Sequence, residues 1–427
     1  MAHGHHEKTL PADLSAPAFV NTWRTRALIV GVVALVSGIV LALLANAQGD
    51  HWAHFFRGWL LGFMICFGWA VGGLAVLMVQ YCSGGKWGLL IRRPLEAMTR
   101  TLPLVFVFFL PIGLAARKLY LWAAFPDPEG ALKNGWINPA QAHAIAFKRP
   151  MLNVYSMWAV TVVCFLIWLF YTFKLNRLSL QRDADPEPNN RFWQKKFENI
   201  SGFGIVVYAV TLTAGAIYWV MSLDPTWYSS VYGLQFLVGQ GYGVLALVIL
   251  TVIGLSKGEP FRTVLRTTEQ HDLGKLAFAF VMLNMYLAFA QFLIIWSGNL
   301  PEEIPWYLDR LRGGWGYVAT LDFVFHWLLP FSLLLSRDLK RNQRKLMVVC
   351  RLMIFARCWD LFWLIEPNFP DARRNLHFSF GILEYIAIPL ALISFWLAYY
   401  FRELQQRPVV ATNDPHLAEL LEPEHAH

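Results

Sequence analysis

The stretch GWLLGFMICFGWAVGGLAVLMV, residues 58–79, carries no charged side chain and is long enough to cross the hydrocarbon core of a bilayer as a helix. In hydrocarbon every backbone polar group must be paired within the protein, so such a segment must be helical. A strand of a membrane barrel would alternate in polarity, and this stretch does not. It therefore predicts a transmembrane helix.

Comparable apolar runs recur along the whole chain. Of 427 residues, 56% are hydrophobic and only 15% are charged, and the mean hydropathy is +0.42, which is too apolar for a soluble α/β protein. We predict an all-α polytopic membrane protein with about ten transmembrane helices. The runs are residues 27–47, 58–79, 95–115, 151–173, 201–221, 231–255, 276–296, 315–335, 346–365 and 380–400.

Lys and Arg predict the orientation, because cytoplasmic loops carry most of them. If the tails at 1–26 and 402–427 are cytoplasmic, 23 of the 36 basic residues fall on that side, 10 on the other and three within spans. We therefore expect a ten-helix domain over 27–401 with both termini in the cytoplasm. This topology and contact with anionic lipids explain the net charge of +8 with no need for nucleic acid.

A weak internal repeat at an offset of 171 residues aligns the second predicted span with the sixth and Gly68 with Gly239. Its halves would cover about 55–222 and 228–366 and would run in the same direction. This predicts two four-helix bundles plus two extra helices. The glycines of the second span, at positions 58, 62, 68 and 72, are most simply explained by close helix packing.

The connection between the seventh and eighth spans predicts a short surface helix. Asn299 can cap it, Pro301 suits its first turn, and Glu302 and Glu303 favour the positive end of the helix dipole. Gly313 then marks its end.

Redox ligands are scarce in this sequence. The five cysteines form no CxxC pair and no ferredoxin-like run, which argues against iron–sulfur ligation and covalent haem. A buried b-type haem would need two facing histidines within the spans, and only His326 lies deep in one. We expect no redox cofactor and no metal in this chain.

Ionisable residues inside spans are costly and are candidates for function. Asp322 and His326 are four residues apart on the eighth span and share a helix face, and Arg357 and Asp360 are three apart on the ninth and can pair. The candidates for a proton relay are Asp322, His326, Asp360, Glu384 and Arg357 toward the middle and outer face, and His271, Asp272, Glu96 and Arg100 toward the cytoplasmic ends.

Two interpretations of these residues stay open at the level of sequence. Histidine changes charge most easily near neutral pH, so two half-channels meeting near His326 would fit the order of depths. Alternatively, Arg357 neutralises Asp360 or Glu384 as a structural ion pair, and His326 is a core residue.

Four stretches go beyond generic membrane features. Together they closely resemble the ActF family of membrane subunits from bacterial alternative complex III, a distant branch of the NrfD/PsrC-like superfamily. The resemblance runs from the second span to the ninth, and the third stretch is long enough to be specific. The stretches are GGKWGLLIRRPLEAMTRTLPL (84–104), VMSLDPTWYSSVYG (220–233), FVMLNMYLAFAQFLIIWSGNLPEEIPWYLDRLRGGWG (280–316) and PFSLLLSRDLKRN (330–342).

This resemblance implies a subunit of a quinol:electron-acceptor oxidoreductase in the bacterial inner membrane. Quinol or menaquinol would be oxidised, and electrons would pass through iron–sulfur clusters and c-type haems on partner subunits to a soluble cytochrome or a terminal oxidase. The implied partners are an ActC-like paralogous membrane subunit, an iron–sulfur subunit, and multihaem and monohaem cytochromes c. Quinol oxidation is generally placed in the ActC-like partner, while this family is named a second quinone-binding subunit and is proposed to conduct protons.

Two rival functions belong to other classes. A secondary transporter would need discontinuous helices at matched positions of inverted repeats, and the sequence shows none. A purely structural anchor would differ from a proton relay only in whether the buried ionisable residues are needed for proton transfer.

Overall fold

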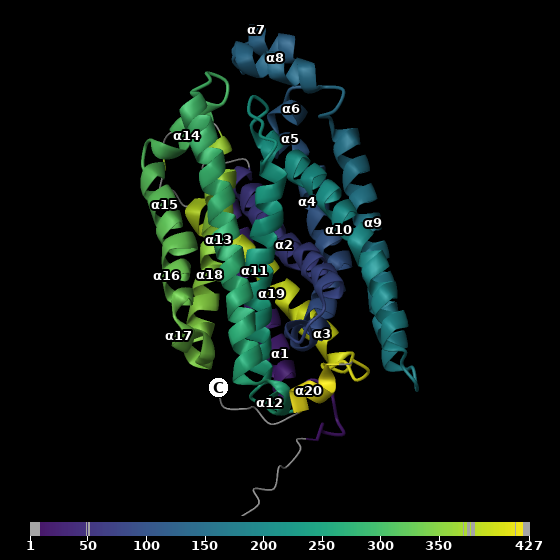
Figure 1. Cartoon of the computed structure of the whole chain (residues 1–427). Helices are drawn as coiled ribbons and strands as arrows, with labels where there is room; N and C mark the ends of the chain where they lie inside the picture. The colour runs from purple at the N-terminus through teal and green to yellow at the C-terminus, as the bar shows by residue number, and fades with distance from the viewer. Residues whose placement is uncertain are drawn as a thin grey trace, which may run out of the picture.

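The computed structural model describes residues 9–47, 49, 52–369, 371–373, 376, 381–414 and 416–421. Every regular element within these ranges is a helix (Figure 1). Eight helices there are long and apolar enough to cross a membrane, and the bent pair α3–α4 makes a ninth. The all-α polytopic fold is confirmed, and the chain is a multi-pass membrane protein. Parts of both predicted tails, and the start of the last predicted span, lie outside the described residues.

All ten predicted spans correspond to helical segments. Nine of these segments are the eight long apolar helices and the bent pair α3–α4. The tenth is α18, whose charged side chains make it less apolar than the others. The helices are α1 Phe19–Ala47, α2 Ala53–Ser83, α3 Trp87–Thr99, α4 Leu102–Leu114, α5 Ala116–Leu119, α6 Leu121–Ala124, α7 Pro128–Lys133, α8 Pro139–Lys148, α9 Val154–Asp183, α10 Asn190–Trp219, η1 Met221–Leu223, α11 Tyr232–Leu255, α12 Phe261–Val264, α13 Thr267–Gly298, α14 Ile304–Leu311, α15 Trp315–Asp322, the π-helix η2 Phe323–Leu328, α16 Leu329–Leu335, α17 Arg337–Arg341, α18 Gln343–Ile365, η3 Glu366–Asn368, α19 Gly381–Gln405 and α20 Leu417–Leu421.

The long helices pack as two groups of four, and each group includes one of two central helices, α2 and α11. In the first group α2 contacts α3, α4, α9 and α10, with α3 and α4 forming one broken span. In the second, α11 contacts α13 and α18, which both contact the span made of α15, η2 and α16. The central helices α2 and α11 pack against each other, and α19 packs between α2 and α1. This is two four-helix bundles with α1 and α19 as the extra helices.

Glycines allow α2 to approach its neighbours closely, as the sequence predicts. A Cβ placed on Gly62 would lie 3.0 Å from the backbone of Pro389 on α19. One on Gly72 would lie 2.9 Å from the side chain of Gln240 on α11. Larger residues at these positions would push the helices apart.

The third predicted span is broken between α3 and α4, where the axis bends by 41°. Pro103, in the first turn of α4, has no N–H to donate to the carbonyl of Thr99. The hydroxyls of Thr99 and Thr101 donate to the carbonyls of Glu96 and Met98, at 2.7 Å each. Threonine hydroxyls therefore satisfy two of the backbone carbonyls that lead into the break, as polar groups within a membrane require.

The eighth predicted span is also irregular, because the π-helix η2 interrupts it. A secondary transporter would need such interruptions at matched positions of inverted repeats, and the sequence predicts none. The suggested parallel repeat would align the third span with the seventh, and α13 in that position is continuous. The interruptions are thus not at matched positions, and they add no support for a transporter built on inverted repeats.

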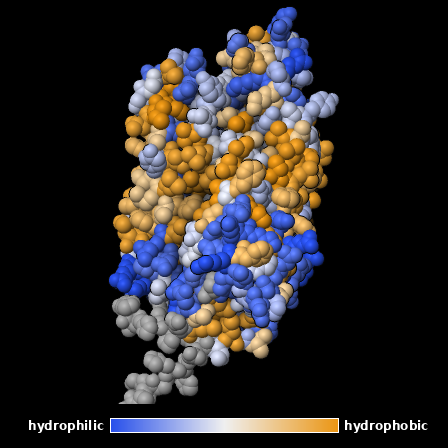
Figure 2. All heavy atoms as spheres, turned by 45° about the vertical axis from the view of Figure 1, so that its right-hand side comes forward, coloured by the Kyte–Doolittle hydropathy of each residue, from blue (hydrophilic) through white to orange (hydrophobic). Residues whose placement is uncertain are grey.

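Exposed side chains show where lipid surrounds the protein. We call the end with α7, α8 and α14 the upper end and the end with α12, α17 and α20 the lower end (Figure 1). Figure 2 shows hydrophobic surface around the middle of the molecule and hydrophilic patches above and below it. Large apolar side chains such as Val33, Leu166 and Phe203 are more than half exposed. Such exposure fits hydrocarbon as the solvent.

Candidate functional site

Three ionisable side chains meet within the second bundle, and we call them the buried triad: Asp322, His326 and Asp360. Asp322 ends α15, His326 lies in the π-helix η2, and Asp360 lies on α18. The imidazole Nδ1 is 3.7 Å from Oδ1 of Asp322 and 3.9 Å from Oδ1 of Asp360. All three side chains are at most 5% exposed. The sequence predicted that Asp322 and His326 share a helix face, and Asp360 joins them from a neighbouring helix.

The local structure around His326 follows from a proline. Pro330 cannot donate the usual backbone hydrogen bond to the carbonyl of His326 four residues earlier. The hydroxyl of Tyr242, on α11, donates to that carbonyl at 3.1 Å. The tyrosine ring also meets the imidazole edge-on at 4.6 Å between centroids. π-Helical turns of this kind are frequent at functional sites.

The imidazole of His326 is held by ring contacts more than by hydrogen bonds. It stacks on the indole of Trp327, whose Nε1 donates to Asn284 of α13 at 2.8 Å. Neither imidazole nitrogen has a hydrogen-bond partner among the described residues. The gaps to the carboxylates are slightly longer than a hydrogen bond, so a small ring movement or one bridging water would connect them.

Arg357 pairs with Asp360 one helical turn away, as the sequence predicts. Gly239 on α11 provides the room, because a Cβ there would lie 2.6 Å from the guanidinium carbon. The guanidinium also lies 5.6 Å from the ring centroid of Phe236. The ion-pair interpretation of Arg357 is therefore correct in geometry, and Arg357 belongs to the same cluster as the triad.

The charges of this cluster do not cancel when the imidazole is neutral. Two carboxylates face one guanidinium, which leaves a formal charge of −1 in a buried site. An uncompensated charge away from water is costly, and one bound proton removes it. The cluster can therefore hold a single exchangeable proton, shared among the triad.

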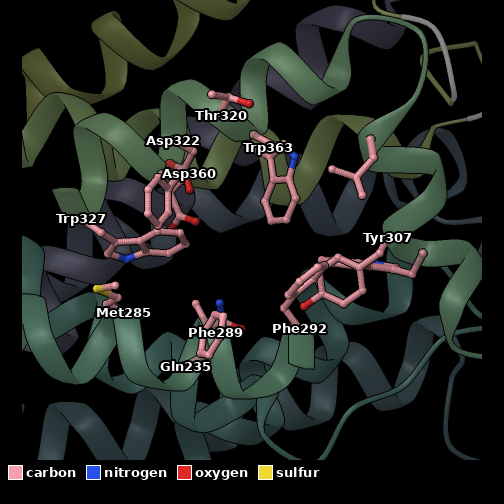
Figure 3. Close-up of a pocket in the computed structure, with 15 residues that line it drawn as sticks. Gln235, Met285, Phe289, Phe292, Tyr307, Thr320, Asp322, Trp327, Asp360 and Trp363 are labelled. Atoms are coloured by element: carbon pink, nitrogen blue, oxygen red, sulfur yellow. The ribbon is translucent and has the colours of Figure 1, made fainter. Parts of the chain in front are cut away.

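A cavity of about 410 Å³ reaches the triad from the direction of α14. Figure 3 shows Asp322, Asp360 and Trp327 along one side of this cavity and Phe292 and Tyr307 on the opposite side. Most of its wall is aromatic or aliphatic, and we call it the aromatic cavity. It gives the buried carboxylates an approach from the upper half of the protein.

The predicted cytoplasmic-side candidates Glu96 and Arg100 lie apart from the triad, at the lower end on the first bundle. Glu96 accepts from Arg93 at 2.7 Å and from the hydroxyl of Tyr81 at 3.4 Å. Arg100 pairs with Glu403 of α19 at 2.9 Å. Both therefore belong to an ion-pair network between helices.

His271 and Asp272 lie near the start of α13, where Asp272 pairs with Lys275 at 3.0 Å on the exposed surface. Thirteen residues, roughly 20 Å of helix, separate His271 from Asn284 beside the triad. The described residues form no chain of ionisable groups across that distance. The lower half-channel stays a prediction.

Glu384, expected to complete the outer half of the relay, is fully buried on α19. A Cβ on Gly58 of α2 would lie 3.2 Å from the backbone oxygen of Glu384. This places Glu384 in the packing between α2 and α19, on the first bundle's side. It stays a candidate, but the geometry groups it with the extra helices.

Among the described residues, two clusters have donor atoms spaced closely enough for a metal ion: the triad, and a second cluster of His54, Glu366 and Asp371. Each is in contact with an arginine. In the triad the ligand atoms lie within 4.8 Å of one another, and Arg357 already neutralises Asp360. Near the upper end, Arg57 bonds both acids of the second cluster, Glu366 at 3.1 Å and Asp371 at 2.6 Å. Burial would raise the pKa of Asp371, but the bond from Arg57 dominates and lowers it. A bound cation in that cluster would face the guanidinium.

Comparison of the chain with protein-family models and with curated proteins found no match.

Proposed function

We propose that this chain is a redox-inactive membrane subunit of a bacterial quinol-oxidising complex of the alternative complex III type, and that its buried triad relays protons. The observation that carries the relay is the triad itself: an imidazole within 4 Å of two carboxylates, and a net formal charge, with Arg357 included, that one proton removes. Histidine among two carboxylates has the chemistry for proton exchange near neutral pH.

The resemblance in sequence supports the placement in such a complex. Its longest stretch, 280–316, supplies much of the wall of the aromatic cavity, including Met285, Phe292, Trp306 and Tyr307. This resembling stretch therefore lines the cavity that reaches the proposed site. On this proposal the partners are an ActC-like membrane subunit, an iron–sulfur subunit and c-type cytochromes, which carry the redox cofactors.

The proposed orientation puts the lower end in the bacterial cytoplasm and the protein in the inner membrane. The basic loops that the positive-inside rule assigns to the cytoplasm include α17, Arg337–Arg341, at the lower end. The aromatic cavity would then connect the triad with the outer side. Proton delivery from the cytoplasm would need water to enter between α13 and α16 during turnover.

Membership of the complex is tested by mild purification from native membranes. We expect an iron–sulfur subunit and haem-bearing cytochromes to co-purify with the chain. We expect the chain itself to show no haem absorbance. Isolation as a homodimer free of redox partners would contradict this part of the proposal.

The relay is tested separately, in assembled complex reconstituted into vesicles. Asp322→Asn and His326→Leu should lower proton release per electron, because each removes a proton-binding group of the triad. Glu187→Gln, at an exposed carboxylate between α9 and α10, is the matched control and should leave the ratio unchanged. An unchanged ratio in both triad variants, together with poor assembly, would mean that the triad only holds helices together.

A second candidate function is quinol binding in the aromatic cavity, and the shape of the cavity favours it. An apolar cavity with carboxylates at its inner end suits a ring that donates hydrogen bonds. Thr320→Trp would narrow the cavity and leave the three triad residues unchanged in identity, and the exposed Tyr317→Trp on the same helix is its control. A raised KM for quinol in Thr320→Trp, with normal proton release per electron, would favour quinol binding over the relay.

A further inference from the structure

A second cavity, which is polar, lies far from the triad. It is lined by the end of α2, α3, α9, the start of α10 and residues 414 and 416 of the C-terminal segment that follows α19. Figure 1 shows α3 and α20 toward the lower end. Its volume is about 80 Å³. We call it the arginine pocket. The residues that matter for its chemistry are Gln80, Arg92, Arg182, Gln194 and Asp414.

Two arginines in this pocket share one carboxylate. Arg92 donates to Asp414 at 2.5 Å and to Gln80 at 3.3 Å. Arg182 lies 3.4 Å from the same carboxylate oxygen of Asp414. Both guanidinium groups are buried, with Arg92 at 3% and Arg182 at 5% exposure. The two arginines and Asp414 together therefore carry a formal charge of +1.

Arg182 keeps unused donors. Its Nε and one of its terminal nitrogens, Nη2, are buried and have no hydrogen-bond partner among the described residues. The Nε of neighbouring Arg93 also has no partner among the described residues, but Arg93 is paired with Glu96 and Asp183 and does not line the pocket. Each of the two Arg182 atoms exposes less than 1 Å², so the Arg182 side chain must turn for them to reach a ligand in the pocket that it lines. Buried guanidinium donors are normally paired, and an anionic group in the pocket would pair them.

The start of α10 adds to the positive potential. This helix begins at Asn190, and Asn190, Trp193 and Gln194, within its first two turns, line the pocket. The N-terminal end of a long helix attracts anions through its dipole and its free backbone N–H groups. The dipole and the two arginines therefore act on the same cavity.

The C-terminal segment is fastened beside this pocket. The side chain of Asn413 donates to the backbone oxygens of Arg182, Asp183 and Asp185, at 2.7–3.1 Å. Burial would raise the pKa of Asp414, but Arg92 and Arg182 dominate and lower it. Asp414 is thus an anion already held by the arginines, and it leaves the remaining donors of Arg182 unused.

We propose that the arginine pocket binds a phosphate group. The group could come from a phospholipid headgroup or from free phosphate, because both present the same oxygens to the guanidinium donors. The position favours the lipid source. Helix α9 has 30 residues, about 45 Å, which exceeds a hydrocarbon core of about 30 Å, so its end near Arg182 lies at headgroup level.

The test uses the full chain, delipidated in neutral detergent, with two probes: inorganic phosphate and phosphatidylglycerol. Retained lipid is counted by native mass spectrometry, and phosphate binding is measured by calorimetry. Arg182→Gln removes the unused donors and should weaken binding roughly tenfold or more. Arg182→Lys should restore part of it, and the exposed Arg177→Gln on the same helix should bind as the unchanged chain does.

A second variant keeps the test decisive if Arg182→Gln does not fold. Gln194→Glu places a carboxylate at the exposed edge of the pocket without removing a buried group, and it should also weaken binding. Dependence on both positions with lipid alone supports a headgroup site, and the same dependence with inorganic phosphate supports a soluble ligand. Binding that is equal in the unchanged chain, Arg182→Gln and Gln194→Glu would overturn the proposal.

Discussion

Replacing Gly239 with alanine should displace Arg357 from its position beside the triad. The added Cβ would lie 2.6 Å from the guanidinium carbon and 2.7 Å from each terminal nitrogen. Ordinary contact begins at about 3.4 Å, so the guanidinium would have to move by roughly 0.8 Å. The movement is resisted, because the same guanidinium is paired with Asp360.

The magnitude follows from two opposing effects. Glycine to alanine in a helix interior stabilises the helix by about 0.5–1 kcal/mol. Forcing an extra carbon into a packed core costs about 1–3 kcal/mol, and separating the buried pair from Asp360 would add to that cost. Gly202→Ala on α10 isolates the first effect, since nothing lies within 4 Å of a Cβ there.

The assay is unfolding of the purified variants in mixed micelles by titration with SDS. Gly202→Ala should be slightly more stable than the unchanged chain, and Gly239→Ala should be about 1–3 kcal/mol less stable than Gly202→Ala. In reconstituted complex, Gly239→Ala should also lower proton release per electron. If Gly239→Ala is as stable as Gly202→Ala, the tight contact between α11 and Arg357 is wrong.

Three further outcomes are expected. Tyr242→Phe removes the hydroxyl that bonds the backbone of η2 and should cost about 1–3 kcal/mol in the same unfolding assay; no loss would mean that this carbonyl is satisfied otherwise. The pKa of Asp414 is lowered below its ordinary 3.8, so its contribution to docking of the C-terminal segment is complete above that pH and is lost as the pH falls through the lowered value. Hydrogen exchange of the segment, corrected for intrinsic rates, should therefore be unchanged between pH 7 and 5 and rise only below about 4. Reporter fusions after Leu255 and Trp296 should report opposite sides, with the first in the cytoplasm, and a periplasmic signal after Leu255 would reverse the orientation.

Hydropathy predicted the spans because lipid leaves a backbone few alternatives to the helix. The same argument says nothing about interruptions within a span. Pro103 and Pro330 are visible in the sequence, but their consequences depend on which groups replace the missing donors. At η2 the replacement is Tyr242, 84 residues away from His326 on another helix. No local pattern marks Tyr242 as that partner, so the sequence analysis missed it.

The connection before α15 shows a prediction that was half right. The expected surface helix exists as α14, Ile304–Leu311. Asn299 does not cap it, because this residue ends α13 in the left-handed conformation, with φ of 46°. Asparagine is favoured at both positions, as an N-cap and as a left-handed terminator, so composition alone does not choose between them.

The candidate relay residues lie in different places in the structure, and the sequence alone does not predict this. Position along a span gives the height of a side chain in the membrane, but only packing gives the direction in which it points. Asp360 and Glu384 were both placed toward the outer half, yet Asp360 joins the triad while Glu384 lies between α19 and α2. Pairs within one helix, such as Arg357 and Asp360, were predicted correctly because helix geometry fixes them. Contacts between helices, such as Asp360 with His326, depend on packing that glycines at positions such as Gly239 allow.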